Sequence, residues 1–189
     1  WMTVAAQTMA IGPVSLAMTA SAQETDINLG NNTATETTLV GNPPVSCVWN
    51  GANPGDWSDP NNWTPTGVPG GTDTATINSG RAVVNGDAMV ANVNLAATLT
   101  ANANLQVGGT LNLSGTLDGP AVVTIKNLSW TGGVMSGSGV TVIPAEGSAL
   151  LSGSHKYLWG RPFHNAGRLV WTDSGQLYGN SGAVVTNSG

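Results

Sequence analysis

The sequence predicts an all-β protein built as an elongated solenoid. The first observation is composition: only 8% of the residues are charged, and 26 of the 189 are glycine. Asn, Thr, Ser and Gly replace the Lys and Glu that cover the surface of ordinary soluble domains. These residues favour turns and the solvent faces of sheets over helices. The second observation is a series of short runs in which every second residue is apolar, the period of a half-buried strand.

Four of these runs lie at 105–107, 110–113, 122–125 and 140–143. Turn-forming residues bound them, so we expect strands of about four residues. Strands this short cannot hold a core alone and need neighbours stacked in series. The side chains expected inside are Val83, Leu105, Val107, Leu111, Leu113, Val123, Ile125, Val140, Val142, Leu169, Trp171, Leu177 and Val184.

A loose internal repeat supports stacking. The dipeptide Ser-Gly recurs at 114, 136, 152 and 174, at intervals of 22, 16 and 22 residues. These intervals are close to one turn of a parallel β-helix with two or three short strands. The rival architecture is a jelly roll or other β-sandwich, which would use longer strands at intervals of 8 to 12 residues.

The amino-terminal segment predicts export. Residues 1–22 carry no charge and contain the apolar run Met9 to Ala20, followed by small residues that fit cleavage after Ala22. We therefore expect a signal peptide, an extracellular or outer-surface location, and no membrane span in the mature part. No Lys or Arg precedes the apolar run, so we expect its start to be truncated. The alternative is a buried apolar helix, which Gly12-Pro13 would break.

The rest of the chain divides by composition into three parts. Residues 23–46 are polar and predict a leader, linker or loosely attached strand. Residues 47–71 contain Trp49, Trp57 and Trp63. Residues 72–189 show the short alternating runs and turn residues expected of solenoid coils. The three tryptophans either fold over the open end of the solenoid as a cap or lie on the surface as a platform for sugars.

Composition and side-chain spacing argue against several kinds of site. A net charge of −5 with five basic residues gives no footprint for nucleic acid. Cys47, the only cysteine, predicts a buried thiol, with lipid attachment as the alternative. The two histidines, His155 and His164, have no partners at zinc-ligand spacing, so we expect no metal and no cofactor. Asp56 and Asp59 predict turns, with a calcium site as the alternative.

The densest polar group lies near the carboxyl end. We expect it to face solvent from two adjacent coils. Tyr157, Trp159 and Phe163 lie between its members and leave open a glycan-stacking surface, with Tyr157 and Trp159 as the contact aromatics. No catalytic residue is expected, although two of Asp87, Asp118, Glu146 and Asp173 on neighbouring coils would favour a glycosidase or lyase. The polar group comprises His155, Lys156, Arg161, His164, Arg168 and Asp173.

Several short motifs stand out along the chain: VWNG at 48–51, WSDPNNW at 57–63, VPG at 68–70, and GRPFHNAG at 160–167 with the following LVW and GAVVTN. In these motifs the chain resembles the repeat region of large bacterial autotransporter-like, β-strand-repeat surface proteins. This resemblance implies a right-handed parallel β-helix on the cell surface or released from it, contacting surface glycans or the surfaces of host or neighbouring cells. We therefore expect a structural or adhesive solenoid, with a carbohydrate-active β-helix or glycan-binding module as the alternative.

Overall fold

The computed structural model describes residues 12–19, 33–40, 43–51 and 53–189, and the chain forms two units, 1–43 and 44–189. In the first unit, β1 (Gly12–Thr19) pairs antiparallel with β2 (Thr33–Val40). The expected cleavage site at Ala22 lies outside the described residues. In the described residues no helix is long and apolar enough to cross a bilayer.

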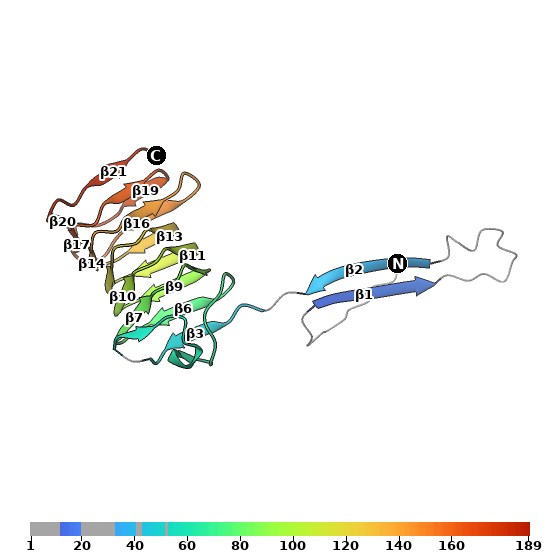
Figure 1. Ribbon diagram of the computed structural model, residues 1–189. Coiled ribbons are helices and arrows are strands. Elements are labelled where there is room, and N and C mark those ends of the chain that lie inside the picture. The colour runs from blue at the N-terminus through green and yellow to red at the C-terminus, as the bar shows by residue number, and fades with distance from the viewer. Residues whose placement is uncertain (1–11, 20–32, 41–42, 52) are drawn as a thin grey trace, which may run out of the picture. The chain divides into compact units, whose positions relative to one another are not determined.

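The second unit is a parallel β-solenoid of about six turns, as the sequence predicts, with its strands stacked in chain order from β3 to β21 (Figure 1). Its strands form three columns, which we call faces 1, 2 and 3. Face 1 consists of β4 (Gly55–Asp56), β7 (Arg81–Val84), β10 (Thr98–Ala101), β12 (Thr116–Asp118), β14 (Gly133–Ser136), β17 (Lys156–Trp159) and β20 (Leu177–Asn180).

The other two faces share the two longest strands, β11 (Leu105–Leu113) and β13 (Val123–Trp130), which run through the corner between them. Face 2 contains their first parts with β8 (Ala88–Val90), β15 (Thr141–Ile143), β18 (Phe163–Asn165) and β21 (Val185–Asn187). Face 3 contains their second parts with β3 (Ser46–Trp49), β6 (Thr74–Ile77), β9 (Asn92–Leu95), β16 (Ser148–Leu151) and β19 (Arg168–Trp171).

Parallel pairing of successive turns excludes the β-sandwich, whose sheets are antiparallel. Cross-turn side-chain hydrogen bonds give the length of a turn: 18 residues in the lower coils, as from Asn94 to Asn112, and 21 or 22 residues in the upper coils, as from Asn165 to Asn187. The Ser-Gly spacing is therefore only an approximate guide to the coil.

The expected strand length of about four residues is confirmed for most of the solenoid, but β11 and β13 are nine and eight residues long. The register of β11 against β13 shifts between Val107 and Thr110, where the strand turns the corner. Gly109 lies in this shift, and a Cβ there would come within 2.8 Å of the Ala91 carbonyl oxygen. A corner this tight requires glycine. Because Gly109 lets the chain turn here without a break in pairing, the runs 105–107 and 110–113, expected as two strands, form the single strand β11.

Apolar residues at alternate positions fill the interior. Six predicted core residues are buried: Leu105, Val107, Leu111, Leu113, Val123 and Ile125. Leu169 and Leu177 are partly buried and pack against the core.

The expected core positions Val83, Val140 and Val142 are wrong by one residue in register. Their neighbours Ala82, Val84 and Ile143 are buried instead, with Thr141 beside them. In a strand, a shift of one residue exchanges the inner and outer faces, and consecutive apolar residues leave that choice open. Trp171 and Val184 are also wrong: both are exposed, because they lie on the last turn of the stack.

The outer side of face 3 carries two rows of uncharged polar side chains. The Asn94 amide donates to the Thr76 hydroxyl (3.2 Å), and the Asn112 amide donates to Asn94 Oδ1 (2.9 Å). In the parallel row, the Asn92 amide donates to Thr74 Oγ1 (3.3 Å). These ladders link successive turns through side chains, so the abundance of Asn and Thr follows from the stacking.

Candidate glycan-contact surface

The three tryptophans of the 47–71 segment form one buried cluster at the first turn. Trp49, Trp57 and Trp63 are each at most 3% exposed. The Trp63 ring meets the other two edge to face, with centroids 5.0 Å and 4.8 Å away, and its Nε1 donates to the Trp57 carbonyl oxygen (2.8 Å). Edge-to-face packing is a favourable geometry for aromatic pairs and leaves no ring face available to a sugar.

This cluster is part of a cap, because Trp63 begins a strand that covers the start of the stack. β5 (Trp63–Thr64) pairs antiparallel with β3 on the edge away from β6, so it covers the strand edge that begins the stack. A short 3₁₀ helix, η2 (Pro60–Asn62), leads into it, and the Asp59 side chain accepts from Asn61 N at the helix start. The arrangement is that of the aromatic cap, and it protects an edge that would otherwise template association.

Asp56 and Asp59 serve the turns of this cap. The Asp56 carboxylate accepts from Asn85 Nδ2 and from the backbone and hydroxyl of Ser58, and these bonds hold its pKa below the ordinary value. In the described part of the chain no three His, Cys, Asp or Glu side chains cluster as metal ligands would. Cys47 is buried as expected; burial and the Asp73 carboxylate raise the pKa of its thiol.

A second aromatic cluster lies outside, on face 1 in the upper coils. Trp159 on β17 is 47% exposed and Tyr178 on β20 is 43% exposed. Tyr157, two residues before Trp159 and half-buried, stacks on Tyr178 with centroids 5.3 Å apart and planes 16° apart. It also meets Trp159 at 5.7 Å. The structure therefore brings the two predicted contact aromatics, Tyr157 and Trp159, into one surface and adds Tyr178. Phe163, the third aromatic expected among the polar group, is buried in β18 instead.

Two residues expected at the surface are inside. Lys156 is fully buried, because it begins β17 on the inward side. Its ammonium donates to the Ser154 carbonyl oxygen (2.9 Å), lies 4.0 Å from the Asp173 carboxylate, and is 5.9 Å from the centre of the Trp171 ring. These contacts all lie within the upper coils, so the Lys156 ammonium is unavailable to a ligand.

Arg161 is also fully buried, at the corner between faces 1 and 2. Burial lowers its pKa to about 10, an effect that the Asp118 carboxylate opposes, so the guanidinium is charged at neutral pH. Oxygens of the two preceding turns surround it, and this planar five-donor group suits such a site. The acceptors are Thr141 Oγ1 (2.8 Å) and the carbonyl oxygens of Gly119 (2.9 Å), Ala121 (3.0 Å), Val140 (3.2 Å) and Ser136 (3.3 Å).

The other four members of the polar group are not buried, and they do not converge. His155 is beside Tyr178 and accepts from Gln176 N, whereas His164 on face 2 contacts the Thr186 hydroxyl. Arg168 is exposed on face 3. The Asp173 carboxylate accepts a hydrogen bond from the backbone N–H of Gly175, two residues further along the chain. The expected solvent-facing cluster is therefore wrong for its two central cations, because the alternation of β17 and the corner at 160–162 turn them inward.

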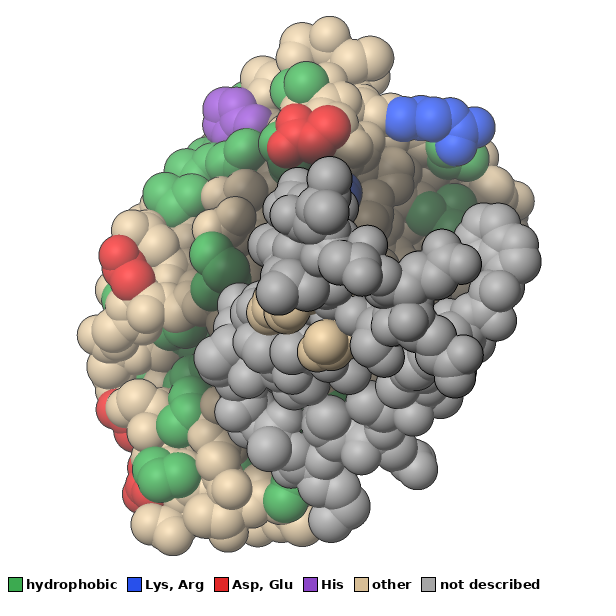
Figure 2. Space-filling view, turned by 90° about the vertical axis from the view of Figure 1, so that its right-hand side faces the viewer, with side chains coloured by type: hydrophobic (Ala, Val, Ile, Leu, Met, Phe, Trp, Pro, Cys, Tyr) green, Lys and Arg blue, Asp and Glu red, His purple; other side chains and the backbone are tan. Residues whose placement is uncertain are grey.

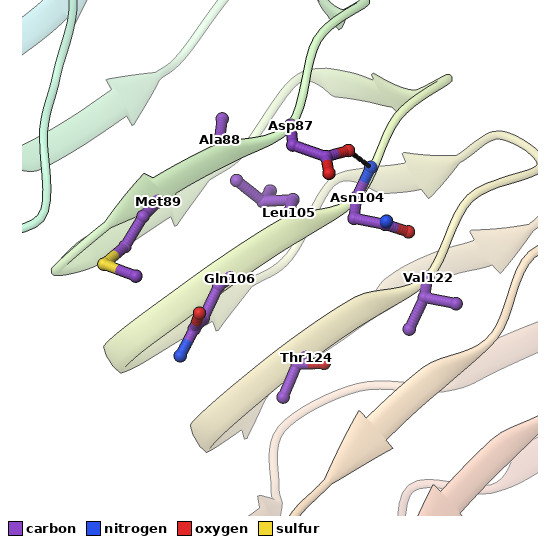
Figure 3. Close-up of a pocket in the computed structure, with 8 residues that line it drawn as sticks. All are labelled: Asp87, Ala88, Met89, Asn104, Leu105, Gln106, Val122 and Thr124. Atoms are coloured by element: carbon purple, nitrogen blue, oxygen red, sulfur yellow. Dashed lines mark hydrogen bonds between the residues drawn. The ribbon is translucent and has the colours of Figure 1, made fainter.

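A shallow hollow of about 540 Å³ lies on face 2 (Figure 3). Met89, Gln106 and Thr124 point to the same side of three successive strands, and Asp87 accepts from Asn104 N at the strand starts. Its lining includes no aromatic residue, so the outer cluster on face 1 is the stronger candidate for contact with a sugar.

The four carboxylates that would favour a glycosidase or lyase lie in four different strands or connections of the solenoid. Asp87 precedes β8, Asp118 ends β12, Glu146 lies between β15 and β16, and Asp173 lies between β19 and β20. Asp118 accepts from the Ser136 hydroxyl (2.9 Å).

No family model, curated protein or solved structure matches the chain. The site is therefore interpreted from its own geometry. Sequence reasoning missed Tyr178; its signal was the pattern of β20, in which Tyr178 and Asn180 share the outward parity of Tyr157 and Trp159.

Proposed function

We propose that the protein is a secreted or cell-surface solenoid with a structural or adhesive role and no catalytic activity. The observation that carries this proposal is the outer aromatic cluster: Tyr157, Trp159 and Tyr178 are presented on a rigid parallel sheet, where they contribute little to the core. Large exposed aromatics on a regular scaffold are typical of contact surfaces.

The charge distribution supports a neutral partner. Of the five basic residues, Lys156 and Arg161 are buried, which leaves Arg81, Lys126 and Arg168 at the surface. On the part of this face that Figure 2 describes, uncharged polar side chains and backbone alternate with hydrophobic patches, and few charged side chains are visible. Nucleic acids and strongly anionic polysaccharides need a basic footprint, so we expect the partner to be a neutral glycan or a glycan-coated surface.

The signal-like segment 1–22 and the resemblance to autotransporter-like surface proteins support export to the outside of a bacterial cell. Intact-mass analysis of the protein exported with a basic start restored would test this part: we expect a mature chain beginning at Gln23. A mature chain that retains the run Met9 to Ala20 would contradict it.

Adhesion itself is tested with beads that carry the full chain. We expect them to be retained on surfaces coated with neutral polysaccharide, while reducing-sugar release and unsaturated-product absorbance stay at background. Turnover abolished by Asp173→Asn or His164→Ala would instead establish the alternative, a carbohydrate-active β-helix. Beads retained no better than uncoated ones would contradict the adhesive role.

A further inference from the structure

One outward row of face 1 combines an exposed indole with polar groups on both sides. In the strand register, Ser136 lies opposite Trp159, and Trp159 lies opposite Asn180. Asp118 continues the row on β12 and accepts from the Ser136 hydroxyl through Oδ1. An apolar ring is thus flanked by a hydroxyl and a carboxylate toward the lower coils and by an amide toward the upper coils.

The second outward row holds this indole in place. Tyr157 lies in register with Tyr178, and their rings stack nearly parallel. The Tyr157 ring of this pair also contacts the Trp159 ring, with the two ring planes inclined by 55°. A ring fixed by neighbours loses little conformational freedom on binding, which favours affinity.

We propose that Trp159, with Asp118, Ser136 and Asn180, binds a neutral oligosaccharide whose sugar ring stacks on the indole. This inference rests on the proposed adhesive role and names its contact site. The apolar C–H face of a sugar matches the indole, and its hydroxyls match the flanking acceptors and donors. Asp118 Oδ2 accepts no hydrogen bond from the described residues and is free to accept one from a sugar hydroxyl.

The dimensions select an oligosaccharide over a single sugar. Neighbouring strands are about 4.8 Å apart, so Asp118 lies about 10 Å along the row from Trp159. A ligand that stacks on the indole and also reaches the carboxylate must therefore extend along the solenoid axis. Because Asp118 is acidic and the two upper-coil cations are buried, an anionic chain is disfavoured.

Isothermal titration of the full chain with cellohexaose, laminarihexaose and mannohexaose tests the site, with a polygalacturonate oligomer as the anionic comparator. We expect at least one neutral hexamer to bind and the anionic oligomer to bind at least about tenfold more weakly. Trp159→Ala should weaken neutral binding by about tenfold or more, Trp159→Phe should retain part of it, and Asp118→Asn should weaken it by about threefold or more.

Trp171→Ala is the matched control, because Trp171 is 45% exposed but lies on face 3. We expect it to change affinity by less than about twofold. Equal losses in the Trp171 and Trp159 variants, unchanged binding in Trp159→Ala, or no binding of any neutral hexamer would overturn the site. Bead retention that persists in Trp159→Ala would overturn the site while the adhesive role stands; absence of retention by the unaltered chain would overturn the adhesive role itself.

Discussion

The first and the upper turns of the solenoid both carry three neighbouring aromatic residues, and they use them in opposite ways. Trp49, Trp57 and Trp63 point inward, pack edge to face, and close the beginning of the stack. Tyr157, Trp159 and Tyr178 point outward from face 1, although their strands pair in the same parallel manner. The difference arises from strand parity and from the cap strand, since residue type is similar in the two clusters.

The inner cluster therefore serves the stability of the fold, whereas the outer cluster is available for contact with a partner. The rings of the inner cluster are packed against one another and shielded from water, so removing one of them leaves a cavity. The outer cluster retains much of its hydration, so removing a ring exposes little that was buried. The two clusters should therefore respond differently to the same kind of substitution, which Trp63→Ala and Trp159→Ala test directly. Arg161→Met and Asn94→Ala, at two polar sites between the clusters in expected effect, complete a series from the largest loss of stability to the smallest.

Trp63→Ala should have the largest effect. Its ring is 1% exposed and contacts both other tryptophans, so we expect a loss of about 3 to 5 kcal/mol in the free energy of unfolding and a tendency to aggregate through the uncovered edge of β3. Denaturant unfolding with light scattering measures both. An unfolding midpoint equal to that of the unaltered chain would show that the cap contributes nothing.

Arg161→Met should come next. Methionine fills similar space but donates no hydrogen bond, so the oxygens of the two preceding turns lose a shared partner. We expect a loss of about 1 to 3 kcal/mol, with Arg161→Lys intermediate because an ammonium cannot reproduce the planar fork. Chemical denaturation measures the difference. A methionine variant at least as stable as the unaltered chain would mean that burying the charge costs more than its hydrogen bonds return.

Asn94→Ala should have a smaller effect. Asn94 is the middle member of a ladder that connects three turns, donating to Thr76 and accepting from Asn112. Losing both bonds at a partly exposed position should cost about 0.5 to 1.5 kcal/mol. A thermal melt of this variant beside Ser129→Ala, in the same row of face 3, separates the ladder bonds from a general loss of polarity; equal stability of the two variants would contradict a role for the ladder.

Trp159→Ala should have the smallest effect on stability, below about 0.5 kcal/mol, because nearly half of the side chain is already in water. The same unfolding assay that is used for Trp63→Ala measures it. A loss comparable to that of Trp63→Ala would remove the distinction between the two clusters and assign the outer ring to the core.

Much of the fold could be predicted because short alternating runs and turn-forming residues act locally. The six core residues that were predicted correctly between Leu105 and Ile125 follow directly from that alternation. Where two apolar residues are adjacent, as at Val83 and Val84, the pattern does not say which one faces inward, because both choices satisfy local preferences. The outcome depends on register against the neighbouring turn, which is a property of the stack.

The candidate site was predicted only in part, for a similar reason. Tyr157 and Trp159 stood out as aromatics among polar residues. Asp118 and Asn180, which share the outward row of Trp159, lie 41 positions before it and 21 positions after it in the chain. Lys156 and Arg161 were expected outside because buried cations are rare. Their burial depends on carbonyl oxygens of other turns, which no local pattern reveals.

The most direct test of the division between a structural and a contact cluster is hydrogen–deuterium exchange of the full chain, free and retained on the polysaccharide-coated surface. We expect retention to slow exchange in β14, β17 and β20 and to leave exchange in the peptides of the first turn, 46–64, unchanged. Slowed exchange in the first turn with none in β14, β17 and β20, or an equal change along the whole solenoid, would contradict it.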